Sequence, residues 1–282
     1  MAVLLGVAGC EPPVALLSIE SDPSPSVSPS PEASLLFDPE ELAERLVAIQ
    51  RQWPRNSLPK PPGARGVNCA RVRCVALTFD DGPGPYTGRL LDILARHQAR
   101  ATFFVLGRMV AEDRGENLRR MVVEGHEIGN HTWDHLPLPQ LSEKSIRFEL
   151  TSTQKVVKRL SGVKMTMMRP PYGSTGRRVA AEASRLGLAQ VLWSVDTLDW
   201  RDRDSRLVAQ RATQATPGAI VLMHDIHPTT VEAVPAVLNQ FVQRGYTFVT
   251  LSELYGVPRL VPGRAYTSMG DGARGTAATE IP

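Results

Sequence analysis

Two adjacent carboxylates end an apolar, strand-like run. Asp80 and Asp81 directly follow residues 75–79 and precede a Gly-Pro-Gly sequence at 82–84. Like charges repel and Asp is disfavoured in strands, so a simple turn would not need both. Alternation along a strand points the two side chains in opposite directions, but both can face one site where the strand gives way to the turn. One carboxylate could then bind a metal ion while the other stays free as a base. The alternative is a solvated turn with a spare charge.

A pair of histidines follows in the motif His-Thr-Trp-Asp-His, at His131 and His135. The two imidazoles are four residues apart, which places them on one face of a helical turn. Alone, such a pair is often a surface coincidence. With a carboxylate from another strand end it becomes a two-histidine, one-aspartate set with open coordination positions. Zinc is the usual ion of a hydrolytic site of this kind, with cobalt, nickel or another divalent ion as alternatives, and non-haem iron uses a similar set.

Three further residues suit the hydrolysis of an amide, which needs a base and an acid for the leaving amine. His224 follows the apolar run 220–223 and could be that acid. Asp199 could orient it, because a carboxylate fixes the imidazole tautomer and favours imidazolium. Arg169, followed by two prolines, could keep the free aspartate ionised by charge pairing.

From about residue 67, apolar strand-like runs alternate with amphipathic helical stretches. The expected strands are 74–79, 101–107, 126–131, 165–171, 188–196, 219–225 and 246–254. The expected helices are 88–98, 115–125, 142–160, 177–187, 205–213 and 230–245. Apolar strands separated by amphipathic helices are typical of a parallel α/β sheet. Seven alternations favour a distorted (β/α) barrel with about seven strand–helix units over an open sheet.

The residues able to do chemistry gather where the expected strands end. Asp80 and Asp81 end the first strand, His131 ends the third, Arg169 lies near the end of the fourth, and His224 lies near the end of the sixth. Ligands bind at the C-terminal ends of the strands in parallel sheets and barrels. The expected fold therefore brings these side chains to one site.

Composition argues against some classes of partner. The 282-residue chain is 42% hydrophobic and 22% charged, with a net charge of +3. Basic residues are scattered rather than gathered in a stripe with aromatic residues, so no nucleic-acid partner is expected. No apolar run is long enough for a membrane-spanning helix.

The N-terminal region carries a separate signal. MAVLLGVAGC is a short apolar run with small residues before Cys10, similar to the lipobox of bacterial lipoproteins, in which the cysteine is lipidated. It has no basic residue before the run and is shorter than a usual signal-peptide core, which would mean a start further upstream or a vestigial segment. A disordered apolar terminus is the alternative. We divide the chain into this segment with its Pro/Ser-rich spacer (1–34), a helical extension and linker (35–66), a catalytic domain (67–256) and a loosely ordered tail (257–282).

Cys69 and Cys74 remain as an even pair if Cys10 is lipidated, as expected outside the cytosol. In an extended chain their Cα atoms would be about 17 Å apart, whereas a disulfide needs ~4.4–6.8 Å. Residues 70–73 would have to turn sharply without Gly or Pro. A disulfide and a pair of reduced thiols are both open interpretations.

Five motifs in order make residues 67–256 resemble the NodB-type polysaccharide deacetylases of carbohydrate esterase family four. The motifs are TFDDG, HTWDH, RPPYG, DTLDW and LMH. The resemblance implies a distorted (β/α) barrel with fewer than eight units, a divalent metal ion, and hydrolysis of acetyl groups on a polysaccharide.

The resemblance also implies a role for each motif residue. Asp80 would be the general base, oriented by Arg169, and His224 the general acid, tuned by Asp199. The backbone N–H of Tyr172 would stabilise the oxyanion. The implied metal ligands are Asp81, His131 and His135, and the implied acetyl-pocket residues are Trp200, Leu222 and Pro171.

The sequence thus predicts a metal-dependent hydrolase that removes N-acetyl groups from N-acetylglucosamine-type residues of a cell-envelope polysaccharide. Peptidoglycan is the substrate that we favour, because an N-terminal anchor and spacer would hold the barrel against the cell wall. Chitin oligomers and acetylxylan are the alternative substrates, and a non-catalytic glycan-binding protein and an iron oxygenase are the alternative classes. We expect a monomer, secreted or on the outer face of a bacterial cell envelope, that contacts a membrane only through Cys10.

Overall fold

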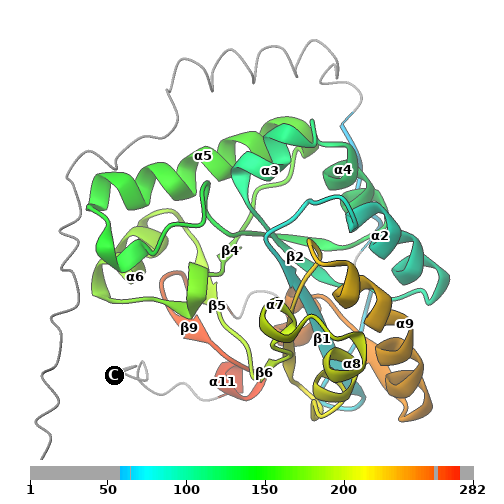
Figure 1. Ribbon diagram of the computed structural model, residues 1–282. Helices are drawn as coiled ribbons and strands as arrows, with labels where there is room; N and C mark the ends of the chain where they lie inside the picture. Colours follow the sequence, from blue (N-terminus) through cyan, green and yellow to red (C-terminus); the bar gives the residue numbers. More distant parts are fainter. Residues whose placement is uncertain (1–57, 64, 257–259, 274–282) are drawn as a thin grey trace, which may run out of the picture. The chain divides into compact units, whose positions relative to one another are not determined.

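The computed structural model describes residues 58–63, 65–256 and 260–273. Within them, nine strands form one sheet: β1 (Arg73–Asp80), β2 (Thr102–Val105), β3 (Glu127–Asn130), β4 (Met167–Met168), β5 (Ala189–Val191), β6 (Val195–Asp196), β7 (Ile220–His224), β8 (Tyr246–Phe248) and β9 (Ala265–Tyr266). Their order is β6-β7-β1-β2-β3-β4-β5-β9, with β8 paired to β1 (Figure 1). All of these pairs are parallel. In the described part of the chain the end strands β6 and β9 do not pair with each other, so the barrel is open. The predicted α/β class and distorted barrel are confirmed.

Ten helices are described around this sheet: α2 (Thr87–Arg96), α3 (Gly107–Glu112), α4 (Glu116–Val123), α5 (Glu143–Ser161), α6 (Arg177–Arg185), α7 (Asp199–Asp202), α8 (Ser205–Ala212), α9 (Pro228–Gln243), α10 (Leu251–Tyr255) and α11 (Gly270–Ala273). Helix α5 shows how the sequence sets their ends. The Ser142 side chain accepts a hydrogen bond from the Ser145 N–H, and Gly162, with φ 77°, ends the helix. Such a hydroxyl cap satisfies one of the free N–H groups of the first turn, and glycine adopts the left-handed conformation at little cost.

The structure corrects the sequence prediction in three segments. The run 188–196 contains two strands, β5 and β6, rather than one. The run 246–254 is β8 followed by α10, because Thr250 and Glu253 form a capping box that starts a helix. Residues 260–273, expected to belong to a loosely ordered tail, form β9 and α11. The lipobox-like segment with Cys10 and the helix expected in 35–66 lie outside the described residues.

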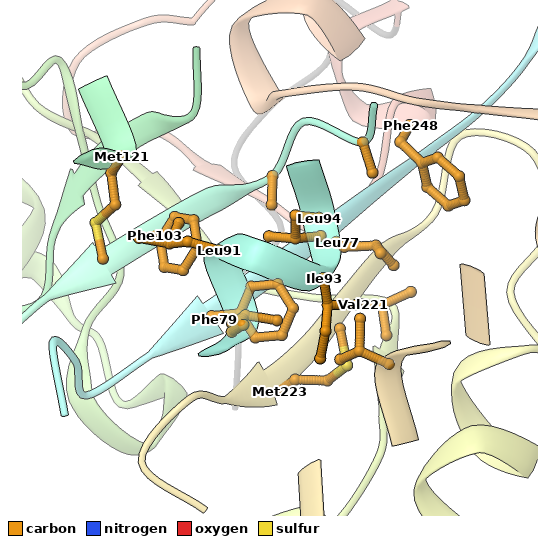
Figure 2. Close-up of a cluster of buried hydrophobic side chains, with 14 of the residues drawn as sticks. Leu77, Phe79, Leu91, Ile93, Leu94, Phe103, Met121, Val221, Met223 and Phe248 are labelled. Carbon is orange, nitrogen blue, oxygen red and sulfur yellow. The ribbon is translucent and has the colours of Figure 1, made fainter. Parts of the chain in front are cut away.

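The core packs around β1, of which seven of eight residues are buried. This matches a central strand of a parallel sheet, which is covered on both faces. Figure 2 shows Phe79 and Phe103 with Leu91 and Leu94 of α2 in one cluster of buried side chains, and the Phe79 and Phe103 rings stack with centroids 5.4 Å apart. Because the strand is held along its length, the position of Asp80 at its end is well defined.

Cys69 and Cys74 form a disulfide, with their Cα atoms 5.4 Å apart. Asn68 makes the reversal that this bond needs. Its carbonyl oxygen accepts a hydrogen bond from the Arg71 N–H, and its side-chain oxygen accepts one from the Ala70 N–H. The Asn68 side chain thus stabilises a sharp turn in a segment that contains no Gly or Pro.

None of the described helices has the length and apolarity needed to cross a bilayer.

Candidate active site

The site lies at the C-terminal ends of the strands, as predicted for a parallel barrel. In the register of β1 with β7, Asp80 is the Cα partner of His224. Asn130, the last residue of β3 and the neighbour of His131, is the partner of Met168, the neighbour of Arg169. Strand pairing alone therefore brings these parts of the sequence together.

Arg169 is fully buried and holds Asp80 through a network of hydrogen bonds. Its Nη1 donates to Asp80 Oδ1 and to Thr78 Oγ1, both at 2.8 Å. Its Nε donates to the Val191 carbonyl oxygen at 3.0 Å, and its Nη2 to the Leu192 carbonyl oxygen at 2.9 Å. A buried guanidinium is stable only when its donors are satisfied, and here four acceptors, one of them a carboxylate, meet that need. The network fixes the Asp80 carboxylate in one orientation.

Asp81 lies between the two histidines of the HTWDH motif. Its Oδ1 is 3.4 Å from both His131 Nε2 and His135 Nε2, and this buried oxygen has no hydrogen-bond partner among the described residues. The three ligand atoms lie within 4.8 Å of one another. Two atoms that are each about 2.1 Å from a tetrahedral metal ion are separated by about 3.4 Å. The donor set and its spacing therefore fit a divalent metal ion.

The tautomer of His131 suits this role. Its Nδ1 is 2.8 Å from the Arg169 carbonyl oxygen. A carbonyl oxygen only accepts, so Nδ1 carries the proton and the Nε2 lone pair faces Asp81. The histidines do not lie on a helical turn, which corrects the sequence prediction: Thr132 has φ 75° and His135 has φ 60°. The motif is a loop that turns both imidazoles inward.

A buried carboxylate from α5 supports this loop. Glu149 Oε2 accepts hydrogen bonds from the Trp133 N–H (2.8 Å) and the Asp134 N–H (2.9 Å). Thr132 Oγ1 also accepts from the His135 N–H at 3.1 Å. Sequence reasoning missed Glu149, because in the sequence it is one polar residue in an amphipathic helix and nothing indicates that it faces inward.

Burial and neighbouring charges shift the pKa values of the candidate metal ligands. Burial opposes ionisation of Asp81, but its interactions with His131, and smaller ones with His224 and His135, outweigh burial and lower its pKa. Burial and the neighbouring His131 lower the pKa of His135. Both shifts favour the metal-binding protonation states, an ionised carboxylate and a neutral imidazole.

His224 and Asp199 form a second pair. His224 Nδ1 is 2.8 Å from Asp199 Oδ1, and Asp199 Oδ2 accepts from the His224 N–H at 2.7 Å and from Thr230 Oγ1 at 2.6 Å. Burial lowers the pKa of His224, but Asp199, with Asp80 and Asp81, outweighs this effect and raises it to about 9. The imidazole therefore stays protonated at neutral pH. Thr230, whose hydroxyl donates a hydrogen bond to Asp199, was also missed by sequence reasoning.

The residues predicted to bind the oxyanion and the acetyl group differ in their exposure to solvent. Tyr172 has φ 60°, the residue is 69% exposed, and its ring centroid is 4.6 Å from that of His135. Trp200, on α7, is 48% exposed, whereas Leu222, on β7, and Pro171 are buried. The imidazole of His227 lies 6.0 Å from that of His224, centroid to centroid.

Comparison with known proteins assigns the chain to a family. A family model described as polysaccharide deacetylase matches residues 68–191. A chitooligosaccharide deacetylase of Bradyrhizobium sp. (strain ANU 289) is 37% identical over 201 residues, which are 65% of this chain and 91% of that protein. The chain belongs to the polysaccharide deacetylase family. The resemblance stated from the five motifs is thereby confirmed.

Two further proteins are similar over much of this chain. The peptidoglycan-N-acetylglucosamine deacetylase PgdA of Listeria monocytogenes serotype 1/2a (strain 10403S) is 40% identical over 232 residues, 81% of this chain. The chain spans about half the length of that relative, 49%. A solved structure described as "T48 deacetylase with substrate" is 44% identical, with a TM-score of 0.68, and covers 71% of this chain and 100% of its own.

Proposed function

We propose that this chain is a metal-dependent N-deacetylase that acts on N-acetylglucosamine-type residues of a cell-envelope polysaccharide, with peptidoglycan as the preferred substrate. One observation carries the proposal: the unpartnered Asp81 Oδ1 lies 3.4 Å from two histidine Nε2 atoms, beside an Arg169–Asp80 pair and a His224–Asp199 pair. Metal-assisted amide hydrolysis uses a metal site, a base and an acid, and each of these three groups of residues can provide one of them.

In this proposal Asp81, His131 and His135 would hold the divalent ion, and zinc is the usual ion of a hydrolytic site with such ligands. A divalent ion held there supplies Lewis acidity toward a carbonyl oxygen and lowers the pKa of water. Asp80 accepts the proton of the attacking water. Arg169 keeps one Asp80 oxygen occupied at 2.8 Å, so the other oxygen is left to take the proton.

His224 is the general acid for the leaving amine. Its Nδ1 is engaged by Asp199, so Nε2 delivers the proton. The raised pKa, about 9, keeps that proton in place at neutral pH. The Tyr172 backbone N–H, set by a positive φ, donates to the developing oxyanion. Trp200, Leu222 and Pro171 enclose the acetyl group.

The substrate class rests on the relatives. The Listeria relative is named for peptidoglycan N-acetylglucosamine and the Bradyrhizobium relative for chitooligosaccharides. Chitin oligomers are therefore the first alternative, and acetylxylan is a more distant one. We further propose a monomer on the outer face of the cell envelope or secreted, with Cys10 as the lipid anchor and no nucleic-acid partner.

The test is acetate release by the purified protein from peptidoglycan, chitin oligomers and acetylxylan, measured by mass spectrometry before and after metal removal. We expect release that stops with the chelator and returns with zinc. Release that survives complete metal removal would refute the metal mechanism. A protein that binds glycan but releases no acetate with metal restored would be the non-catalytic alternative.

Substitution of the two adjacent carboxylates tests their separate roles. Asp81→Asn should lose both metal and activity, because it weakens one of three ligands. Asp80→Asn should lose activity and keep its metal, since Asn preserves the side-chain shape without a base. Metal content is measured by elemental analysis of the dialysed proteins. Equal metal content in the two inactive variants would contradict this division.

A further inference from the structure

Residues 260–273, here called the C-terminal strap, extend the sheet beyond β5. The Gln190 N–H donates to the Arg264 carbonyl oxygen and the Leu192 N–H to the Tyr266 carbonyl oxygen, both at 2.8 Å. The Gly263 N–H donates to the Leu188 carbonyl oxygen, also at 2.8 Å. Figure 1 shows β9 beside β5 and α11 beyond it. The family model ends at residue 191, so the strap lies outside the part of the chain that it matches.

The strap is also tied to the start of β7 and to α10. The Met269 N–H donates to the Gly218 carbonyl oxygen at 3.0 Å. Tyr266 is buried, and its ring packs against Tyr255 with centroids 5.3 Å apart. The Tyr255 hydroxyl donates to the Ser268 carbonyl oxygen at 2.8 Å. The strap therefore connects β5 with the segment that leads into β7.

Leu192 connects the strap to the active site. Its N–H is bonded to Tyr266 of the strap, and its carbonyl oxygen accepts from Arg169 Nη2 at 2.9 Å. The neighbouring Val191 carbonyl oxygen accepts from Arg169 Nε at 3.0 Å. Arg169 in turn donates to Asp80 at 2.8 Å. A continuous series of hydrogen bonds thus runs from the strap to the carboxylate.

We propose that the C-terminal strap positions Asp80, acting through Leu192 and Arg169. Strand β5 has three residues and its other neighbour, β4, has two, so little else in the sheet fixes the carbonyl groups that hold Arg169. Without β9, β5 would be an edge strand, with the Leu192 N–H unpaired and its peptide free to rotate. Displacement of a base by a fraction of an ångström is costly to the rate, and a shift of about 1 Å can cost on the order of 100-fold. The expected effect on the rate rests on the proposed function. The positioning of Asp80 by the strap does not.

The experiment uses Tyr266→Ala in the full chain, which removes the buried ring that anchors the strap. We expect kcat to fall on the order of 10-fold, with KM and metal content unchanged, because the proposed metal ligands follow β1 and β3, which do not pair with β5 or β9. The second readout is the NMR signal of the Arg169 Nε–H, whose exchange with water should become faster. This signal reports the Val191 bond directly and does not depend on activity.

Three further variants distinguish positioning from stability. Tyr266→Phe keeps the buried ring and should restore kcat and the Nε–H protection. Val237→Ala, a core truncation in α9, should lower Tm but leave kcat per folded molecule and the Nε–H signal unchanged. If Tyr266→Ala does not fold, Tyr255→Phe, which removes only the bond to Ser268, should show smaller changes in the same direction.

The outcomes separate this proposal from the proposed function. Folded Tyr266→Ala with wild-type kcat and an unchanged Arg169 signal would show that the strap only stabilises the fold, and would overturn the proposal. An equal loss of kcat in Val237→Ala would also overturn the proposal, because it would show that loss of stability alone lowers kcat. If the wild type releases no acetate, the proposed function fails, while the Arg169 signal still decides whether the strap holds the guanidinium.

Discussion

Replacement of Asp199 with Asn should shift the pH dependence of catalysis strongly. Burial lowers the pKa of His224, and the hydrogen bond and charge of Asp199 are the main effects that outweigh burial and raise it from 6.5 to about 9. The amide oxygen of the substituted side chain can still accept a hydrogen bond from His224, but the amide carries no charge. The imidazole then loses its charge partner and keeps its burial penalty.

The magnitude follows from that shift. A change of about 2.5 pKa units corresponds to about 3 kcal/mol. If the pKa of His224 in the variant is near the ordinary value for histidine, about 3% of the imidazole is protonated at about pH 8, against about 90% in the wild type. We therefore expect kcat/KM at about pH 8 to fall on the order of 30-fold, and to change little at about pH 5.5. A bound divalent ion opposes the contributions of Asp80 and Asp81, so both proteins must be compared at the same metal loading.

The same pair predicts a change in stability with a defined sign. A histidine whose pKa is raised by folding contributes stability that is complete below 6.5 and is lost as the pH rises through about 9. The wild type should lose up to about 3 kcal/mol of unfolding free energy over this range, and Asp199→Asn should lose little. Urea denaturation at several pH values measures both.

The assay is a pH profile of kcat/KM from acetate release. Thr230→Val is the matched control, because it removes the 2.6 Å hydrogen bond to Asp199 and keeps the carboxylate charge. Its alkaline limb should move much less than that of Asp199→Asn. An alkaline limb that stays in place in Asp199→Asn, with His224 intact, would refute His224 as the acid whose proton limits the rate.

Two other predictions concern stability. Burial raises the pKa of Asp225 from 3.8 to about 7, so the folded state holds a proton that the unfolded state releases and stability falls as the pH rises from about 4 to 7. Asp225→Asn should flatten this slope and add as much as about 4 kcal/mol at about pH 8, measured by urea denaturation; an unchanged slope would contradict it. Replacement of both Cys69 and Cys74 with Ser should cost about 2 kcal/mol, the chain-entropy value for so short a loop, and thiol titration of the unreduced wild type checks the bond.

The convergence of the predicted site residues could be read from the sequence, and the residues and elements that support them could not. Asp80 and His224 end long apolar runs, so their convergence at the strand ends follows from the parallel topology. Glu149 and Thr230 lie within helices, where one inward polar residue looks like any other. Strand β9 has two residues, too few to show an alternating pattern, and tertiary pairing alone makes it a strand.

The HTWDH motif shows the limit of spacing as a guide. A separation of four residues suits a helix, and the spacing therefore predicted a helical turn. The actual loop uses positive φ at Thr132 and His135, and the buried Glu149 carboxylate accepts hydrogen bonds from two of its N–H groups. The two imidazoles converge in either geometry, so their proximity to Asp81 could be predicted although the predicted conformation was wrong.

The adjacent carboxylates can serve one site because the backbone leaves strand geometry between them. Asp80 is the last residue of β1, and Asp81 has φ 73°, a left-handed conformation that costs a non-glycine residue about 1–2 kcal/mol. Asp tolerates it better than most residues, which limits the choice of side chain at this position. In continued strand geometry Asp81 would point to the opposite face. Its Oδ1 instead lies 3.4 Å from His131 Nε2, while Asp80 Oδ2 is 3.7 Å from the same atom. Strain at one residue thus converts a repelling pair into two carboxylates on one side of the sheet, one bound to Arg169 and one directed at the histidines.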